Sequence, residues 1–562
     1  MKSRISFFDK TVFRNDITRF APVWGLYLIG GLLLSMNMID GGNYGYTAMG
    51  LMEGLNGLAV VNLIYAAVCA QMLFGDLFNS KLCNALHALP LRRETWFVTH
   101  SLAGLAFSVV PNLILSLCFL PMMGEPWHLA FVWLLGMTLE YLFFFGVAAL
   151  SCMLSGSRVG MAAVYAVIHF FSVILFWFVD TFYAPLLPGL DIRETGFIRF
   201  CPVAWIVGQL GDLAQFDYIS GSRIGTIGRY EFVGLTDGWW YLAILAGLGI
   251  GALVLGVLLY RRRRLESAGD LLAFKPLEPV FAVIATLSSG AVFQLMGDLF
   301  VGGTNYLYLI VGILVGYFAS RMLLERRVKV FRKKNFFGCA AIVAAMGLSL
   351  LLTWLDPIGL TRWVPEPEKV ASVTVADDYT YYEEYESDRA IFLENQDLIA
   401  TVTRAHQHLI SEGSDEWIDN GAPVTLVYEM KDGRQIRRHY FYPDNGEAAR
   451  VFNSLFSDPA YVMGYLEWDT FLKSVEAVEV DWQHKVLGEE ARELVEAIYD
   501  DCEAGTMVQS RSHFNYVTSI RIIRYDREIY LDIFEDCVHT MAWLEENLPE
   551  WEYNGKYYAV YD

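Results

Sequence analysis

Nine apolar stretches, separated by polar, glycine-rich or arginine-rich segments, dominate the first 356 residues. Each is close to the roughly 20 residues that a helix needs to cross the hydrocarbon core of a bilayer. The pattern therefore predicts nine membrane-spanning helices. Their expected ranges are 21–38, 58–75, 102–123, 128–154, 159–179, 239–260, 279–296, 306–324 and 336–355.

Residues 1–20 have a different pattern, in which basic side chains such as Lys10 and Arg14 alternate with apolar ones such as Phe13 and Ile17. No small-residue cleavage site follows a short apolar core, so a cleavable signal peptide is not indicated. A basic amphipathic segment of this kind is typical of a helix that lies in the membrane interface. We expect an interfacial helix there, with its basic face towards the cytoplasmic headgroups.

The basic loops predict the orientation of the chain, because cytoplasmic loops of membrane proteins are enriched in Lys and Arg. In a nine-span arrangement the basic N-terminus, Arg158, the run 261–264 and the basic segment 326–334 all fall on one side. The opposite loops 39–57, 124–127 and 297–305 contain no Lys or Arg. We therefore expect a multi-pass protein of the plasma membrane with a cytoplasmic N-terminus and an extracytoplasmic C-terminal domain.

Composition and charge divide the chain at the same place. The chain is 55% hydrophobic with a mean hydropathy of +0.35, too apolar for a soluble protein of this size. After Asp356, however, 17 Lys and Arg stand against 41 Asp and Glu. Such an acidic half argues against nucleic acid as a partner.

Residues 357–562 predict an acidic extracytoplasmic α+β domain. Strand-like alternation at 370–375, an amphipathic helix over 390–410 and a hairpin over 424–442, with Asp432-Gly433 as its tight turn, are followed by a weaker echo. The echo is a strand at 475–480, a helix at 489–502 and a hairpin over 517–534. We therefore expect a tandem repeat. The tyrosine- and acid-rich patch 379–385 precedes the first helix, and the long outer loop 180–238 predicts short helices that dip back towards the membrane.

The segment 76–96, between the second and third spans, is short, polar and amphipathic. Leucines recur there at helical spacing, and Pro90 ends the helix because it lacks a backbone N–H. A peripheral partner could bind such a segment, although an ordinary inter-helix loop that keeps its charges in water would look the same. The candidate contact residues are Lys81, Asn84, Leu86, His87, Leu89, Pro90, Arg92, Arg93 and Glu94.

Two ionisable residues lie in the middle of predicted spans, Glu140 in the fourth and His169 in the fifth. An ionisable group at that depth costs several kcal/mol unless it is paired or faces water. Glu140 and His169 could therefore line a pathway or pair with each other. The alternative is a buried, protonated Glu140 that serves packing alone.

Motifs for chemistry within this chain are missing from the sequence. It contains no P-loop, no H-E-x-x-H and no G-x-S-x-G, and no C-x-x-C metal pattern. His406 and His408 are two residues apart on an expected helix and so point to different faces, which disfavours a metal site. In the outer domain Cys502 and Cys537 could pair or remain free thiols. We expect a protein that is not itself an enzyme and holds no metal or cofactor.

The run 78–95, which contains Leu-His-Ala-Leu-Pro-Leu-Arg-Arg-Glu-Thr, resembles the cytosolic coupling region of ABC-2-type transporter permeases of Gram-positive bacteria. The interfacial helix, a six-span core over 21–264 and the long outer loop before the sixth span are similar too. Three additional spans over 265–356 and the outer domain depart from the six-span pattern. They resemble a branch of these permeases that carries a C-terminal extracytoplasmic domain.

The resemblance implies a permease subunit that couples ATP–Mg hydrolysis by a separate cytosolic ATPase to export of an amphipathic peptide, antibiotic or lipid. It also implies a second permease half, either a homodimer or a related chain. In this reading Leu86, Leu89 and Pro90 sit in an apolar groove of the ATPase, surrounded by charged rim contacts. Two alternatives remain: an envelope sensor whose outer domain detects an antimicrobial or cell-wall compound, and a membrane enzyme, which the missing motifs disfavour.

Overall fold

The structure is a computed structural model, and it describes residues 7–36, 44–88, 91–123, 126–190, 200–219, 229–301, 306–377, 391–414, 418, 421–443, 445–456, 458, 475–481, 484–507, 516–524 and 528–548. The chain divides into two compact units. The first combines Met1–Val179 with Gly196–Gly347, and the second combines Asp180–Thr195 with Leu348–Asp562. The segment Asp180–Thr195, which follows the fifth predicted span, therefore groups with the C-terminal residues.

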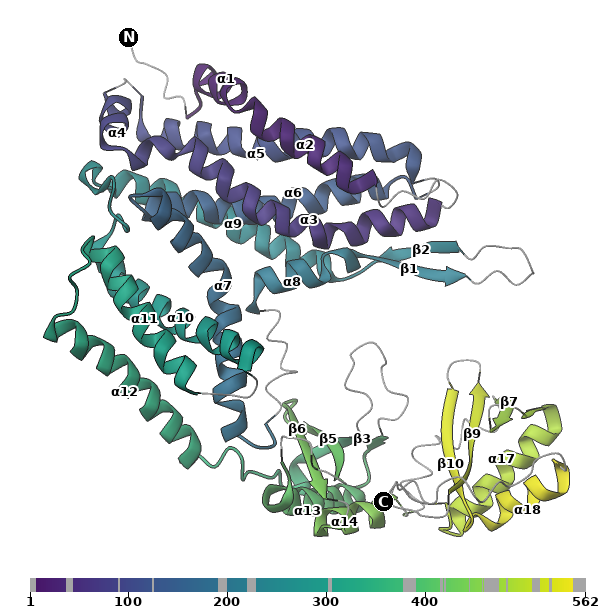
Figure 1. The fold of residues 1–562 in the computed structure, drawn as a ribbon. Coiled ribbons are helices and arrows are strands. Elements are labelled where there is room, and N and C mark those ends of the chain that lie inside the picture. The colour runs from purple at the N-terminus through teal and green to yellow at the C-terminus, as the bar shows by residue number, and fades with distance from the viewer. Residues whose placement is uncertain are drawn as a thin grey trace. The chain divides into compact units, whose positions relative to one another are not determined.

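Most of the first unit is a bundle of long apolar helices (Figure 1). Eight helices in the described part of the chain are long and apolar enough to cross a membrane. A ninth crossing is formed if α1 and α2, which meet at a 57° bend, count as one. This confirms the prediction of a polytopic helical membrane protein. The helices are α1 (Lys10–Arg19), α2 (Ala21–Met36), α3 (Tyr44–Leu73), α5 (Arg93–Phe119), α6 (Leu129–Leu154), α7 (Arg158–Phe182), α9 (Gly238–Arg262), α10 (Glu278–Val301), α11 (Tyr306–Glu325) and α12 (Lys333–Leu355).

The second span begins earlier than its hydropathy indicates. Helix α3 begins at Tyr44, so most of the expected loop 39–57 is helical. Gly50, Gly54 and Gly57 lower the mean hydropathy of this stretch, but Leu51 and Leu55 are spaced to face the bundle and are buried there. Tertiary packing thus extends the helix beyond the purely apolar run.

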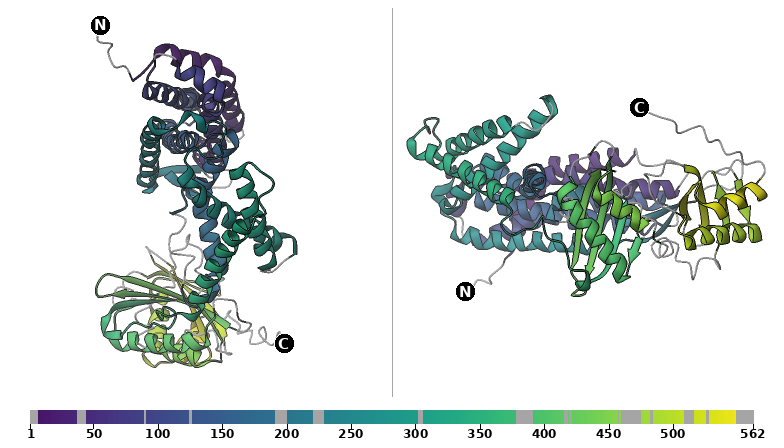
Figure 2. Two further views of the ribbon diagram at one scale, coloured as in Figure 1. Left: turned by 90° about the vertical axis from the view of Figure 1, so that its left-hand side faces the viewer. Right: turned by 90° about the horizontal axis from the view of Figure 1, so that it is seen from below.

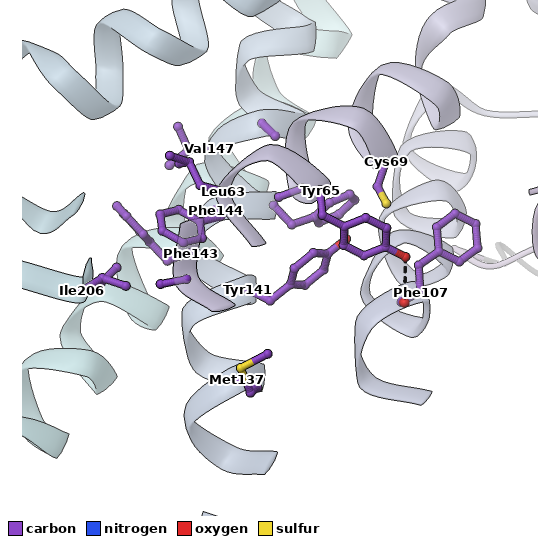
Figure 3. Packing of buried hydrophobic residues seen from close by; sticks show 14 of the residues in the cluster. Leu63, Tyr65, Cys69, Phe107, Met137, Tyr141, Phe143, Phe144, Val147 and Ile206 are labelled. Atoms are coloured by element: carbon purple, nitrogen blue, oxygen red, sulfur yellow. Dashed lines mark hydrogen bonds between the residues drawn. The ribbon is translucent and has the colours of Figure 1, made fainter. Parts of the chain in front are cut away.

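Close helix crossings hold the bundle together. At the crossing of α6 and α9, a Cβ on Gly146 would overlap the backbone of Gly249, and a Cβ on Gly249 would overlap that of Leu142 and Phe143. Small residues at such a contact allow helices in a membrane to approach each other, where van der Waals packing replaces the hydrophobic effect. Tyrosine hydroxyls add hydrogen bonds to main-chain carbonyls, as between Tyr65 and Phe107 at 2.9 Å (Figure 3).

The two ends of the bundle carry different structures (Figure 1). One end holds the short helix α4 (Ser80–His87) between α3 and α5. The other holds α8 (Pro202–Gln209) and an antiparallel hairpin of β1 (Ala214–Ile219) and β2 (Arg229–Leu235). The expectation of short helices in the outer loop is correct for α8 and wrong for the hairpin. Alternating aromatic residues, Phe216 and Tyr218 opposite Phe232 and Tyr230, favour strands there.

The second unit contains two four-stranded antiparallel sheets with the same topology. In the first half the order is β4-β3-β5-β6, and in the second it is β8-β7-β9-β10. Each half adds one helix before its hairpin and one after it, visible in green and yellow (Figure 2). The bounds of the first half are β3 (Val370–Asp377), β4 (Ile391–Leu393), α13 (Gln396–Glu412), β5 (Gly421–Met430), β6 (Gln435–Pro443) and α14 (Glu447–Phe456). Those of the second half are β7 (Val475–Val480), β8 (His484–Leu487), α17 (Gly488–Glu503), β9 (Tyr516–Arg524), β10 (Glu528–Phe534) and α18 (Val538–Asn547).

An acidic side chain near the end of the longer helix caps the shorter helix in both halves. Glu412 of α13 accepts a hydrogen bond from the backbone N–H of Ala448 at 3.2 Å. The fully buried Asp501 of α17 accepts from the N–H groups of His539 and Thr540 at 3.0 and 2.7 Å. Equivalent caps, together with the identical strand order, are what the tandem prediction requires. The short strands β4 and β8 are additions that the sequence pattern missed.

Other predictions about this unit have mixed outcomes. Gly433 has a φ of +83°, as the expected tight turn between β5 and β6 requires. Cys502 and Cys537 are both buried free thiols, and burial raises the pKa of Cys537 to about 11. The tyrosine- and acid-rich patch 379–385 lies outside the described residues.

Candidate functional site

The candidate site is the end of the bundle that carries α4, with the main-chain segments around it. Helix α4 follows the short turn η1 (Gly75–Phe78) and has one buried and one exposed side. Cys83 is buried, whereas Lys81, Asn84 and Ala85 are exposed, and Leu82 keeps 50% of its surface accessible. An exposed leucine on a short helix, flanked by polar residues, is suited to contact a partner.

Arg93 connects the start of α5 to the end of α9. Its Nη1 lies 3.1 Å from the carbonyl oxygen of Tyr260 and 3.0 Å from that of Arg263. Tyr260 is in the last turn of α9 and Arg263 is its C-cap residue, where the helix offers no further N–H partners and carries the negative end of its dipole. Next to it, Glu94 forms an ion pair with Arg261 at 2.8 Å.

Arg263 makes a second and more deeply buried connection. Only 4% of its surface is exposed, and its guanidinium donates to the carbonyls of Cys152 at 2.6 Å and Leu77 at 3.2 Å. Cys152 is in the last turn of α6, and Leu77 is in η1, directly before α4. Burial lowers the pKa of Arg263 below its usual range, and the carbonyl acceptors compensate for the lost hydration.

The chain that follows α9 is also fixed to this end. The N–H of Ala273 donates to the carbonyl of Leu154 at 2.7 Å, and Gly269 hydrogen-bonds to Gly156 in the turn between α6 and α7. Asp270 of the same segment forms an ion pair with Arg326, which follows α11, at 2.7 Å. The ends of α6 and α9 therefore meet beside η1, and the residue after α11 is joined to the segment that follows α9.

Helix α1 is attached to the same region. The side chain of Asp16 lies 2.7 Å from Nδ1 of His100 on α5, with only 4% of each side chain exposed. The N–H of Asp9 donates to the hydroxyl of Thr99 at 3.1 Å. A helix is present at Lys10–Arg19, where an interfacial helix is predicted, and it packs against α5 through this buried ionisable pair.

The structure places the predicted contact residues in three groups. Lys81, Asn84 and Arg92 are exposed, whereas Arg93 and Glu94 have partners within the chain. Leu89 and Pro90 lie outside the described residues, as do the side chains of Leu86 and His87. The run 261–264 was expected only to indicate orientation. Its third arginine, Arg263, has a structural role that a run of four arginines does not reveal.

The two intramembrane residues lie on adjacent elements of the bundle. Glu140 is fully buried on α6, and His169 of α7 is 2% exposed. The His169 ring packs edge-on against Tyr165, with a centroid distance of 4.4 Å, and against Phe143 and Phe144. Within the described chain no hydrogen bond or ion pair joins Glu140 to His169, so the pairing alternative is not observed.

Metal-binding groups of three or more His, Cys, Asp or Glu side chains do not occur among the described residues. In comparisons with known proteins, no family model, curated protein or solved structure matches this chain.

Proposed function

We propose that this chain is the membrane subunit of an ATP-driven exporter, and that α4 is the helix on which a separate cytosolic ATPase acts. The observation that carries the proposal is the connection of α4 to three spans. Arg263, which directly follows α9, donates hydrogen bonds to η1, the turn before α4, and to the last turn of α6. Arg93 at the start of α5 donates to the carbonyls at the end of α9. The resemblance of residues 78–95 to permease coupling regions supports the same reading.

The connection explains how a small surface could control a large bundle. An ATPase that changes shape on binding ATP would press on the exposed side of α4, around Leu82. Because η1 and α5 flank α4 in the chain, and Arg93 and Arg263 join them to α9 and α6, these helices would move together. A discrete rearrangement of packed helices is the usual form of such a transition, since packed cores do not deform continuously.

The remaining parts of the proposal come from the resemblance and from the loop charges. ATP and Mg²⁺ would bind the partner ATPase, and a second permease, either another copy or a related chain, would complete the pathway. The arginine-rich end would face the cytoplasm, and residues 357–562 would lie outside. The exported molecule would be an amphipathic peptide, antibiotic or lipid.

A substitution on α4 tests the proposal. The tagged full-length chain is expressed together with the products of the genes beside its own, and recovery of a cytosolic ATPase is measured after purification from the membrane. Leu82→Asp should reduce recovery about tenfold, because it places a charge in the apolar part of the contact. Val328→Asp is the matched control, since Val328 is 76% exposed in the loop between α11 and α12. Equal recovery for both variants would refute the role of α4.

A sensor is the second candidate, and one contact favours it. The segment after α7 is attached to the outer domain: the N–H of His439 donates to the carbonyl of Gly189 at 3.3 Å. Gly189 has a φ of +79° and packs directly on the Tyr440 ring. A ligand bound to this domain could therefore influence α7. Deletion of residues 357–562 separates the two functions, because efflux should persist if the domain only senses.

A further inference from the structure

The core of the bundle contains a carboxyl group, that of Glu140, to which the described residues provide no counter-charge. Glu140 lies on α6 with 0% of its surface exposed. Neither of its carboxyl oxygens has a hydrogen-bond partner among the described residues. A buried carboxylate is stable only when a cation or several donors replace its lost hydration. A positive charge must therefore neutralise the Glu140 carboxyl group.

The polar side chains closest to Glu140 form a small network between four helices. Asn62 of α3 lies beside the carboxyl group. Its Oδ1 accepts a hydrogen bond from the hydroxyl of Tyr27 on α2 at 2.8 Å. That hydroxyl also lies 3.2 Å from Oδ1 of Asn112 on α5, and the Asn112 amide donates to Ser108 at 3.0 Å. The network thus joins α2, α3, α5 and α6, and all of its members are neutral.

The arginines of the packed helices lie at helix ends, where Arg93 begins α5 and Arg158 begins α7. Tyr27 of α2 and Tyr165 of α7 are within electrostatic reach of Glu140, and the Tyr165 hydroxyl donates to the carbonyl of Leu63 at 2.8 Å. Tyr65 and Cys69 of α3 and Tyr141 of α6 lie together nearby (Figure 3). Helix α9 has no titratable residue between Tyr241 and Tyr260, and α2, α3 and α6 contain no Lys or Arg.

Of the two imidazoles on α5 and α7, His100 lies against Asp16, and His169 does not act as the counter-ion of Glu140. It lies beside Phe143 and Phe144, which follow Glu140 by three and four positions on α6, and Tyr165 lies against it. Aromatic rings therefore surround the imidazole, and no ion pair joins it to Glu140 in the described chain. A single positive charge from outside the protein must neutralise Glu140, either a proton or an alkali-metal cation.

The ligands favour the proton. A hard cation such as Na⁺ requires a shell of several oxygen atoms. Here Oδ1 of Asn62 is turned towards Tyr27, and Nδ2 of Asn62 lies 3.8 Å from the Met137 sulfur. We propose that Glu140 is a proton-binding site: the carboxyl group holds a proton while α2, α3, α5, α6 and α7 are packed as in this structure, and releases it when they separate.

This site gives the bundle a coupling between proton release and helix movement. Separation of the helices would admit water to Glu140, the carboxyl group would lose its proton to that water, and repacking would require the proton to return. Each cycle of opening and closing would thus release and rebind one proton. The proposal depends only on the packing of the bundle, so it holds whether or not α4 binds an ATPase.

Infrared spectroscopy of the full-length protein in lipid membranes tests the proposal. At about pH 8 exposed carboxyl groups are ionised, so a carbonyl band of a protonated carboxylic acid arises only from a buried group. We expect such a band in the wild-type protein and its loss in Glu140→Gln, which keeps the shape of the neutral side chain. Glu53→Gln is the matched control, because Glu53 is an exposed glutamate on α3. It should remove carboxylate bands and leave the acid band intact.

The opposite spectrum would overturn the proposal. If the wild-type protein has no acid band at about pH 8, Glu140 is ionised, and sensitivity of its carboxylate bands to Na⁺ would then identify a metal cation as the ligand. If the acid band survives in Glu140→Gln, another group carries the proton. Should Glu140→Gln not assemble, Glu140→Asp replaces it: the acid band must shift in frequency, and an unshifted band contradicts the assignment.

Discussion

Replacement of Arg263 by methionine is the substitution that most directly perturbs the connection between α4 and the bundle. The side chain keeps an unbranched stem but loses the guanidinium donors that contact the carbonyls of Cys152 and Leu77. Each buried carbonyl left without a donor costs about 1–3 kcal/mol. Methionine also removes the need to dehydrate a guanidinium, which offsets part of that cost. We expect a net local destabilisation of roughly 3 kcal/mol.

Hydrogen exchange of the full-length protein in membranes measures this effect where it should occur. A local cost of roughly 3 kcal/mol corresponds to about a 100-fold increase in exchange for amides of η1 and the last turn of α6, if they exchange through local opening. Arg262→Met is the control, because Arg262 is exposed beside it. If both variants exchange at the same rate as the wild-type protein, Arg263 does not hold these segments together and the reasoning fails.

Three further predictions concern packing, capping and pH. Gly249→Ala should prevent the close crossing of α6 and α9 and lower thermal stability in detergent, whereas Gly247→Ala should be tolerated because no atom lies within 4 Å of its added Cβ; equal losses would contradict the crossing. Asp501→Ala should cost about 1–3 kcal/mol by leaving the first N–H groups of α18 without an acceptor, seen as faster exchange confined to α18. Burial lowers the pKa of His406 to about 3, so stability present above about pH 6.5 is lost as pH falls, by about 1.5 kcal/mol between pH 6.5 and 5. Exchange in α13 of the full-length protein should show this loss, and His406→Phe should show a smaller dependence on pH.

The sequence predicts the membrane bundle well because hydropathy is a local property. A helix in lipid must satisfy its backbone hydrogen bonds internally, so an apolar run of sufficient length has few alternatives. The prediction was wrong where tertiary packing takes over. The start of α3 is rich in glycine and becomes helical through contacts of Leu51 and Leu55, and the hairpin β1–β2 depends on pairing across a loop.

The candidate site was predicted in position but not in its contacts. Amphipathic spacing identified α4, and the basic residues around it were evident. The partners of Arg93 and Arg263, however, are backbone carbonyls of helices far away in the sequence, about 110 to 190 residues apart. A carbonyl at a helix end has no side-chain signature, so its partner cannot be read from residue types. The contact between Asp16 and His100 was missed for a similar reason, since the two residues lie on separate elements.

Site-specific photo-crosslinking from position 82 tests the central claim most directly. Leu82→p-benzoylphenylalanine in the full-length chain, expressed with the products of the neighbouring genes, should form a covalent adduct with a cytosolic ATPase on illumination. Trp240→p-benzoylphenylalanine is the exposed control, since 77% of the surface of Trp240 is exposed. It should form no adduct, because Trp240 is near the start of α9, whereas α4 lies near the end of α9. An adduct from position 240 and none from position 82 would contradict the account.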